Sequence, residues 1–292
     1  MRYSERKTKI MTAVLAAALL LLWSTRPALA QAPPSYSPDQ LDKLVSRIAL
    51  YPDPLLAQTL AGATFSDQIP DAAKWADEHH YLNGDELAKA ISDDQLSWDP
   101  SVQALLPFPS VLDTMASDMD WTRSLGDAFL AQRQDVMDAV QRMRQKAKDF
   151  GYLRSNDQIV VNSGPYIDIE PVDPGYICVP AYDPLVVFWP PRPGFVVGGA
   201  ISFGFGIHIG LAFRPWGWGA ARFDWGGHAL FIHDRPWGRV WGNRGVYVHP
   251  YPDVHRWEPA RRTEGHSLIR RSEEERHAAR FGQPHPAERH HR

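Results

Sequence analysis

Cysteine is nearly absent from this 292-residue chain, which contains only Cys178. A single cysteine excludes an intramolecular disulfide, so stability has to come from packing. Cys178 lies in the apolar run 176–179, where we expect it to be a buried, small hydrophobic side chain. An excess of positive charge is also absent, because 31 basic residues face 34 acidic ones. This balance lacks the basic footprint of a nucleic-acid-binding protein, and we expect no nucleic-acid partner.

The sequence also lacks the short motifs of several common enzyme classes. It contains no Gly-x-Ser-x-Gly, no His-Glu-x-x-His, no phosphate-binding glycine loop ending in Lys-Ser/Thr and no dinucleotide fingerprint. Paired aspartates at 93–94, 118/120 and 135/138 stand among polar residues, which favours a solvated helix face over shared acid–base chemistry. The sequence therefore predicts no catalytic residue and no cofactor, and favours a protein that is not an enzyme.

One long apolar run is present, at residues 10–23. Basic residues precede it, and the triplet Ala28-Leu29-Ala30 follows it, as in a cleavable secretory signal. The run is shorter than the ~20 residues that a permanent membrane-spanning helix needs. We therefore expect residues 1–30 to be a signal peptide and the mature chain to start at Gln31, in the periplasm or otherwise exported. Peripheral attachment to a membrane is compatible with this location.

After a linker at 31–37, residues 38–155 have the pattern of a helical domain. Ser37 and Gln40 form a predicted capping box around Pro38 at the first helical position. Further short helices are predicted after 52 and near 70, 85, 100 and 109, where Pro, Asp or Gly interrupts the chain. One helix of about 30 residues is predicted over 121–150, because no proline interrupts it and one apolar stripe runs along it. The stripe consists of Leu125, Phe129, Val136, Val140, Met143 and Ala147.

Beyond this domain the pattern changes three times. Residues 156–190 alternate with period two between prolines, which predicts a small antiparallel β unit. Residues 191–257 are rich in glycine and tryptophan, and residues 258–292 form a charged, His-rich tail that we expect to be disordered. The predicted fold class is α+β, with a mainly helical N-terminal domain.

The Gly/Trp-rich extension leaves several interpretations open. Between 201 and 213 large apolar residues occupy every odd position, as in a strand, but small residues also recur every fourth position, as on a closely packed helix. The tryptophans could stack on sugars, lie at a membrane interface or form the core of an irregular sheet. We expect a contact surface for an envelope protein, a membrane surface or a second copy of the chain. Its candidate residues are Phe203, Phe205, Trp216, Trp218, Trp225, Trp237 and Trp241.

Histidines in the same extension are the candidates for a metal site. Imidazole and carboxylate groups are ligands for zinc or copper, but their spacing here matches no defined motif. The candidate ligands are His228, His233, His249, Asp253 and His255.

Five strings between residues 38 and 190 stand out in the sequence. They are 48–57 (IALYPDPLLA), 98–102 (WDPSV), 121–129 (WTRSLGDAF), 135–141 (DVMDAVQ) and 179–184 (VPAYDP). These strings resemble an exported bacterial family known as domain of unknown function 3300. The resemblance implies a secreted or periplasmic protein of Gram-negative type, and it implies no reaction. Together with the patterns above, it favours an exported cell-envelope protein with a binding or assembly role. The alternative is an envelope-acting hydrolase or a metal-binding protein.

Overall fold

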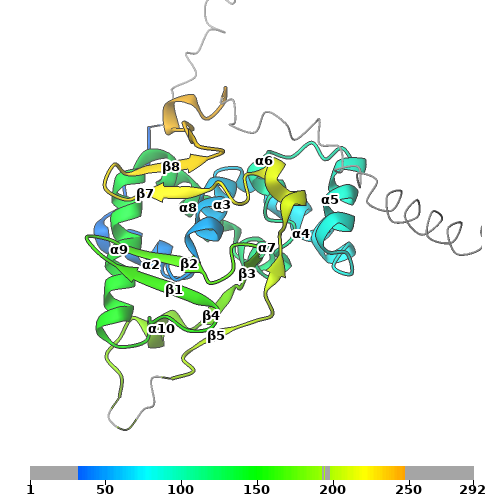
Figure 1. The fold of residues 1–292 in the computed structure, drawn as a ribbon. Coiled ribbons are helices and arrows are strands. Elements are labelled where there is room, and N and C mark those ends of the chain that lie inside the picture. Colours follow the sequence, from blue (N-terminus) through cyan, green and yellow to red (C-terminus); the bar gives the residue numbers. More distant parts are fainter. Residues whose placement is uncertain (1–31, 193, 195–197, 247–292) are drawn as a thin grey trace, which may run out of the picture. The chain divides into compact units, whose positions relative to one another are not determined.

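The computed structural model describes residues 32–192, 194 and 198–246. The predicted signal peptide and C-terminal tail lie outside these residues. Helices and short antiparallel strands together confirm the α+β fold class (Figure 1). The α-helices are α2 (Pro38–Val45), α3 (Asp53–Ala63), α4 (Ile69–Glu78), α5 (Gly84–Asp93), α6 (Pro100–Gln103), α7 (Pro109–Ser117), α8 (Met119–Ala131), α9 (Arg133–Asp149) and α10 (Pro184–Val187).

Helix starts follow the local signals of the sequence. The Ser37 side chain accepts a hydrogen bond from the Gln40 backbone, and the Gln40 side chain bonds back to the Ser37 N–H, so the predicted capping box of α2 is confirmed. Helices α3, α4, α6 and α7 each carry proline in their first two positions, where its missing N–H costs no helical bond.

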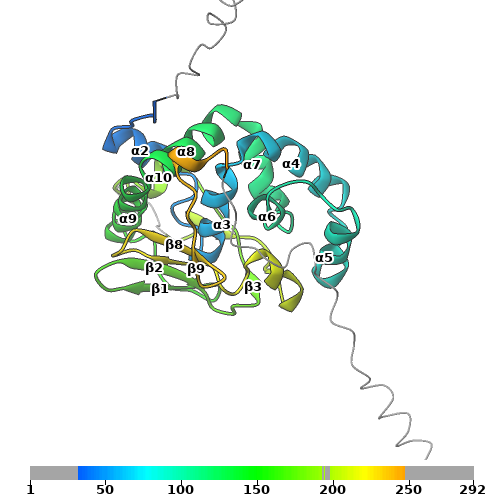
Figure 2. The ribbon, with the colours of Figure 1, turned by 90° about the horizontal axis from the view of Figure 1, so that it is seen from above.

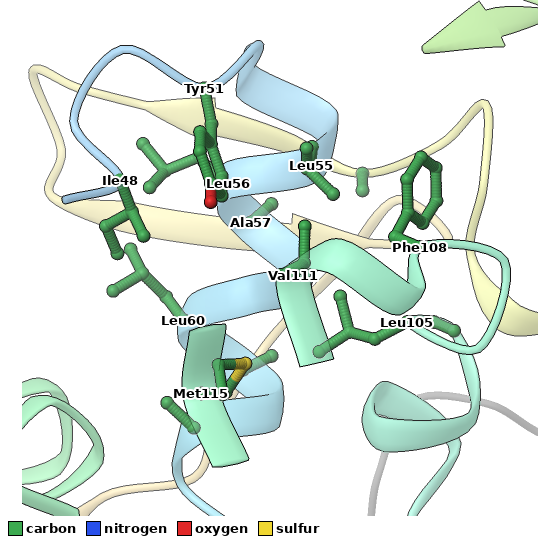
Figure 3. Close-up of a cluster of buried hydrophobic side chains, with 14 of the residues drawn as sticks. Ile48, Tyr51, Leu55, Leu56, Ala57, Leu60, Leu105, Phe108, Val111 and Met115 are labelled. Carbon is green, nitrogen blue, oxygen red and sulfur yellow. The ribbon is translucent and has the colours of Figure 1, made fainter. Parts of the chain in front are cut away.

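Helix α3 lies at the centre of the molecule. It is apolar on nearly every side, and almost all its residues are buried. Figure 2 shows helices on several sides of it and strands on another, in line with its contacts to α6, α8 and two strands described below. Figure 3 shows part of the surrounding cluster, in which Leu55, Leu56 and Leu60 pack among side chains from α7 and the loop before it. A helix buried all round needs partners on every side, and the later parts of the chain supply them.

The prediction of one continuous helix over 121–150 is wrong. Helices α8 and α9 are separated at Gln132, whose backbone (φ −136°, ψ 48°) leaves the helical region. The Gln132 side chain holds the distant Tyr36 backbone, accepting from its N–H at 2.6 Å and donating to its carbonyl at 3.2 Å. The apolar stripe is nevertheless buried across the break, since Leu125, Val136 and Ala147 are all inaccessible.

The first strands form the antiparallel hairpin that period two predicts. Strand β1 (Ile159–Ser163) pairs with β2 (Ile167–Pro171), with Val161 opposite Ile169. Strand β3 (Tyr176–Ile177) pairs with β6 (Ile207–His208), and β4 (Pro180–Tyr182) pairs with β5 (Ile201–Phe203). The period-two interpretation is therefore correct at β5 and β6.

The Gly/Trp-rich part adds a three-stranded sheet and two 3-10 turns. Strands β7 (Arg222–Asp224), β8 (Ala229–Ile232) and β9 (Arg235–Pro236) form the sheet in that order. The 3-10 turns are η2 (Leu211–Trp216) and η3 (Trp241–Asn243), and an earlier one, η1 (Ser66–Gln68), precedes α4. Strand β7 contacts α3, η2 contacts α5 and α6, and η3 contacts α8. One buried core therefore includes residues from the helices, the hairpin and this sheet.

Among the described residues, no helix has both the length and the apolar character that crossing a membrane requires.

Candidate functional site

A buried ion pair lies at the junction of α3, α9 and β2. Asp53 Oδ1 is 2.7 Å from Arg144 Nη1, and both side chains are almost completely excluded from solvent. Arg144 also donates to three backbone carbonyl oxygens, those of Ala49 (2.8 Å), Tyr51 (3.0 Å) and Ile167 (2.8 Å). A buried guanidinium is tolerated only when its donors are satisfied in this way.

The same groups complete the free edge of β2. The Ile167 carbonyl accepts from Arg144 and from Gln141, whose Oε1 accepts from the Ile167 N–H at 2.8 Å. The Ile169 N–H donates to Asp53 Oδ1 at 3.4 Å. Side chains from α3 and α9 thus replace a neighbouring strand, which leaves the opposite edge of β2 for pairing with β1.

Trp225, the residue after β7, contacts both members of the ion pair from the side of the three-stranded sheet. Its Nε1 donates to Asp53 Oδ2 at 3.2 Å, and the Arg144 guanidinium lies 5.0 Å from the centre of its ring. Phe223 stacks on Trp225, with ring centres 4.4 Å apart. Burial raises the pKa of Asp53, and the adjacent Arg144 charge opposes that shift.

Two further carboxylates lie on the outer face of β2. Ile167, Ile169 and Pro171 point into the core, so Asp168 and Glu170 share the other face. Partial burial and repulsion from the Asp53 and Asp168 carboxylates raise the pKa of Glu170 to about 7, and Arg144 opposes this only in part. Glu170 is therefore a carboxyl group poised between its two charge states near neutral pH.

An open cleft of about 670 Å³ lies between the β1–β2 turn and β7. We call it the hairpin cleft, and it is lined by residues 162–166, Asp168 and residues 223–226. Its walls contain the rings of Tyr166, Phe223 and Trp225 and the carboxylates of Asp168 and Asp224. Asp224 Oδ1 accepts the Gly227 N–H at 2.9 Å, which fixes the turn after β7.

Four of the tryptophans expected on a contact surface are buried instead. They are Trp216, Trp218, Trp225 and Trp237. Trp216 Nε1 donates to Gln103 Oε1 at 2.9 Å, and Trp218 Nε1 donates to the Ala104 carbonyl at 3.0 Å. For these four, the structure agrees with the interpretation that the tryptophans are core residues, because the helices supply both apolar cover and hydrogen-bond acceptors.

Three large apolar side chains are exposed on α10, on the residues just after it and in the loop after β5. Phe205 is 100% exposed, Leu185 78% and Trp189 62%. We call these three the apolar surface. Phe203 and Trp241, the other two candidates for contact, are partly buried.

Two grooves accompany the apolar surface. The α10 groove, about 840 Å³, is lined by Tyr152, Leu185, Val186 and residues 189–192. The β4 groove, about 660 Å³, includes Pro184 and Phe205. The charged residues in the two linings are Arg47 and Arg192, and the described residues of neither lining include a carboxylate.

The two described histidine candidates have separate partners. His228 Nε2 lies 2.9 Å from Asp138 Oδ1, and His233 Nε2 lies 2.9 Å from the Pro215 carbonyl oxygen. Within the described residues, no three His, Cys, Asp or Glu side chains converge to hold a metal ion. His249, Asp253 and His255 lie outside the described residues.

Cys178 is partly exposed and not fully buried as expected. Desolvation raises the pKa of its thiol, which disfavours the nucleophilic thiolate.

Sequence reasoning missed the residues around the buried ion pair. Arg144 lies four residues after Val140 and three before Ala147, on the apolar stripe itself, and a charge at a stripe position was the available signal. Asp53 stands between two prolines, and nothing local marks it as buried.

Comparison with known proteins adds the family but no activity. A family model described as Protein of unknown function (DUF3300) matches residues 37–235, which include the ion pair, the apolar surface and the hairpin cleft. The uncharacterized protein YacH of Escherichia coli (strain K12) is 33% identical over 241 residues, or 64% of this chain and 39% of YacH. The chain thus spans about two fifths of that relative's length. No solved structure matches it. Since the family model covers more than half of the sequence, the chain belongs to the DUF3300 family.

Proposed function

We propose that this chain is an exported cell-envelope protein that acts by binding, and that it attaches peripherally to an anionic lipid surface. The signal-like pattern of residues 1–30 supports export. The observation that carries the binding role is the apolar surface. Three large apolar side chains stand in solvent although burying each would contribute ~1.5–3 kcal/mol.

The chemistry around these side chains favours lipid over other occupants. Tryptophan and phenylalanine partition into the boundary between headgroups and acyl chains. Arg192 is the charged group of the α10 groove lining and suits an anionic headgroup, whereas Arg47 of the β4 groove lining pairs with Asp118 at 2.9 Å. The described lining of the α10 groove combines this arginine with aromatic and aliphatic side chains and contains no carboxylate, which suits a surface that docks on such lipids.

Co-flotation with vesicles tests the proposal. Residues 31–292 are mixed with vesicles of phosphatidylethanolamine and phosphatidylglycerol, or of phosphatidylcholine alone. We expect flotation with the anionic vesicles and weaker flotation at high salt, because screening reduces the arginine contribution. The triple variant Leu185→Ser, Trp189→Ser, Phe205→Ser should lose binding. If one such side chain is half buried in the membrane, its removal should lower the partitioning of the protein onto vesicles by ~3- to 10-fold.

The matched control replaces exposed apolar residues elsewhere. Tyr81 and Val172 are 67% and 51% exposed and lie in neither groove lining. The variant Tyr81→Ser, Val172→Ser should float like the parent chain. Equal loss in both variants, or no flotation of the parent, would contradict attachment through the apolar surface.

Export is tested separately by the mature N-terminus. We expect the protein from the periplasmic fraction of a Gram-negative host to begin at Gln31, as measured by mass spectrometry. A full-length chain retained in the cytoplasm or inner membrane would contradict export, whatever the vesicle result.

A further inference from the structure

The walls of the hairpin cleft combine aromatic faces with negative charge. Tyr166 is exposed at the turn of the hairpin, and Phe223 stands across from it on β7. Asp168 and Asp224 lie between these walls, and no lysine or arginine is among the described residues of the lining. A cation is attracted both to a ring face and to a carboxylate, whereas an anion is repelled by both.

Asp168 and Glu170 have no hydrogen-bond or ion-pair partner among the described residues. They are partly buried and share one face of β2, where the Asp168 carboxylate helps to raise the pKa of Glu170. Asp168 is therefore available to pair with a positively charged group in the cleft.

Two arginines of the described residues lie near the cleft, and both have other partners. Arg144 donates to Asp53 and to three backbone carbonyls. Arg222 shares a face of β7 with Asp224, but its guanidinium lies over the Phe231 ring and 3.7 Å from Asp234. Neither arginine pairs with Asp168, which leaves this carboxylate available to a ligand.

We infer that the hairpin cleft binds an organic cation, an alkylammonium or guanidinium group. Its charged end pairs with Asp168 and its carbon stem lies against Tyr166 and Phe223. A volume of about 670 Å³ lies in the usual range for small-ligand sites. The proposal does not depend on lipid attachment, because the cleft shares no lining residue with the α10 groove or the β4 groove.

Calorimetric titration of residues 31–292 tests this site. The probes are putrescine, as a free diamine, and N-acetyl-lysine methylamide, as the side chain of a protein partner. We expect saturable binding of at least one probe, weakened by raising the salt from about 0.02 M to about 0.2 M. Tighter binding of putrescine assigns the site to free amines, and tighter binding of the lysine derivative assigns it to a basic peptide.

Three variants locate the binding. Asp168→Asn should weaken it about tenfold, since it removes a charge-assisted contact. Tyr166→Ala should weaken it about threefold, while Tyr166→Phe keeps the ring and the affinity. The control variant is Asp173→Asn, which removes the same charge from an aspartate outside the cleft. Asp173 accepts the N–H of Gly175 in its turn, as the cleft residue Asp224 accepts the N–H of Gly227.

Glu170 provides a second readout. It faces the carboxylates of Asp53 and Asp168 and the guanidinium of Arg144, and Val160 lies opposite it on β1. A bound cation favours its ionised form, so affinity should fall from pH 8 to pH 6, and Glu170→Gln should abolish that fall. The inference is overturned if neither amine saturates, if N-acetylglucosamine binds as tightly as the amines, or if Asp168→Asn and Asp173→Asn have equal effects.

Discussion

Residues 35–153 and residues 156–246 reach a buried core by different means. The first region places aliphatic side chains at helical spacing, and its helices satisfy their own backbone hydrogen bonds. The second region has strands of two to five residues, and it inserts large rings into the first. Short strands of this kind are not stable alone in water. The second region is therefore shaped by the surface on which it packs.

Polar anchors hold the two regions together. Gln58 Nε2 on the central helix donates to the Trp216 carbonyl at 2.9 Å, and Asp53 accepts from the Trp225 ring. Arg239 Nη1 donates to the Thr64 carbonyl, also at 2.9 Å. Each of these is a buried group whose partner lies more than 150 residues away, so neither region satisfies its polar atoms without the other.

The largest expected effect is at the buried ion pair. Arg144→Met leaves Asp53 ionised without its partner and removes the donors of three carbonyl oxygens. We expect the free energy of unfolding to fall by about 3–5 kcal/mol in urea titrations. The control is Arg142→Met, because Arg142 pairs with Asp42 on the half-exposed side of the same helix and its loss should cost under ~1 kcal/mol. Equal losses would mean that burial adds nothing to the contribution of the ion pair.

An effect of similar size is expected from the loss of a single ring. Trp218→Ala removes a buried side chain that packs on Phe108 and leaves the Ala104 carbonyl without its donor. The expected loss is about 3–5 kcal/mol, with one cooperative transition followed by circular dichroism. Trp241→Ala, in the partly buried turn η3, should cost less. If Trp218→Ala instead gives two transitions, with the helices melting last, the regions fold independently and the comparison is broken.

The sequence predicted the parts of the fold that are encoded locally. Helix starts at Ser37 and after Asp99 follow from side chains that bond to backbone within three residues, and the hairpin follows from alternation within ten. The break at Gln132 could not be predicted in this way. No proline or glycine marks it, and the bonds that hold it go to Tyr36, 96 residues earlier.

The candidate site was predictable only in part, for the same reason. Tryptophan beside glycine is compatible with an exposed ring or a buried one, and the acceptors that settle burial, such as Gln103 and Ala104, lie on distant helices. Asp168 and Glu170 could be placed on one strand face from their spacing. The repulsion between Glu170 and Asp53 could not be predicted, because it depends on the packing of β2 on α3.

The third prediction concerns the pH dependence of stability. Partial burial, and then the carboxylates of Asp53 and Asp168, raise the pKa of Glu170 from 4.5 to about 7, so the folded state binds more protons than the unfolded state between these values. Stability should therefore fall as pH rises from about 4.5 to about 7. Because Glu170 is partly exposed, we expect Glu170→Gln to stabilise the protein at pH 8 by only about 1–2 kcal/mol. The difference should vanish at pH 4, and a constant difference at both values would rule out titration of Glu170 as its cause.

The smallest expected effect is at the surface contact between the regions. His228, in the turn before β8, lies 2.9 Å from Asp138 on α9, and both side chains are partly exposed. Solvent screens such a pair, so a double-mutant cycle of Asp138→Asn and His228→Asn should give a coupling below ~1 kcal/mol. Asparagine is chosen at 228 because it tolerates the positive φ of 51° found there. A coupling above ~2 kcal/mol would mean that exposed contacts join the regions as strongly as the buried anchors do. Comparing the loss of stability in Arg144→Met with this coupling energy therefore shows how much more a buried contact contributes than an exposed one.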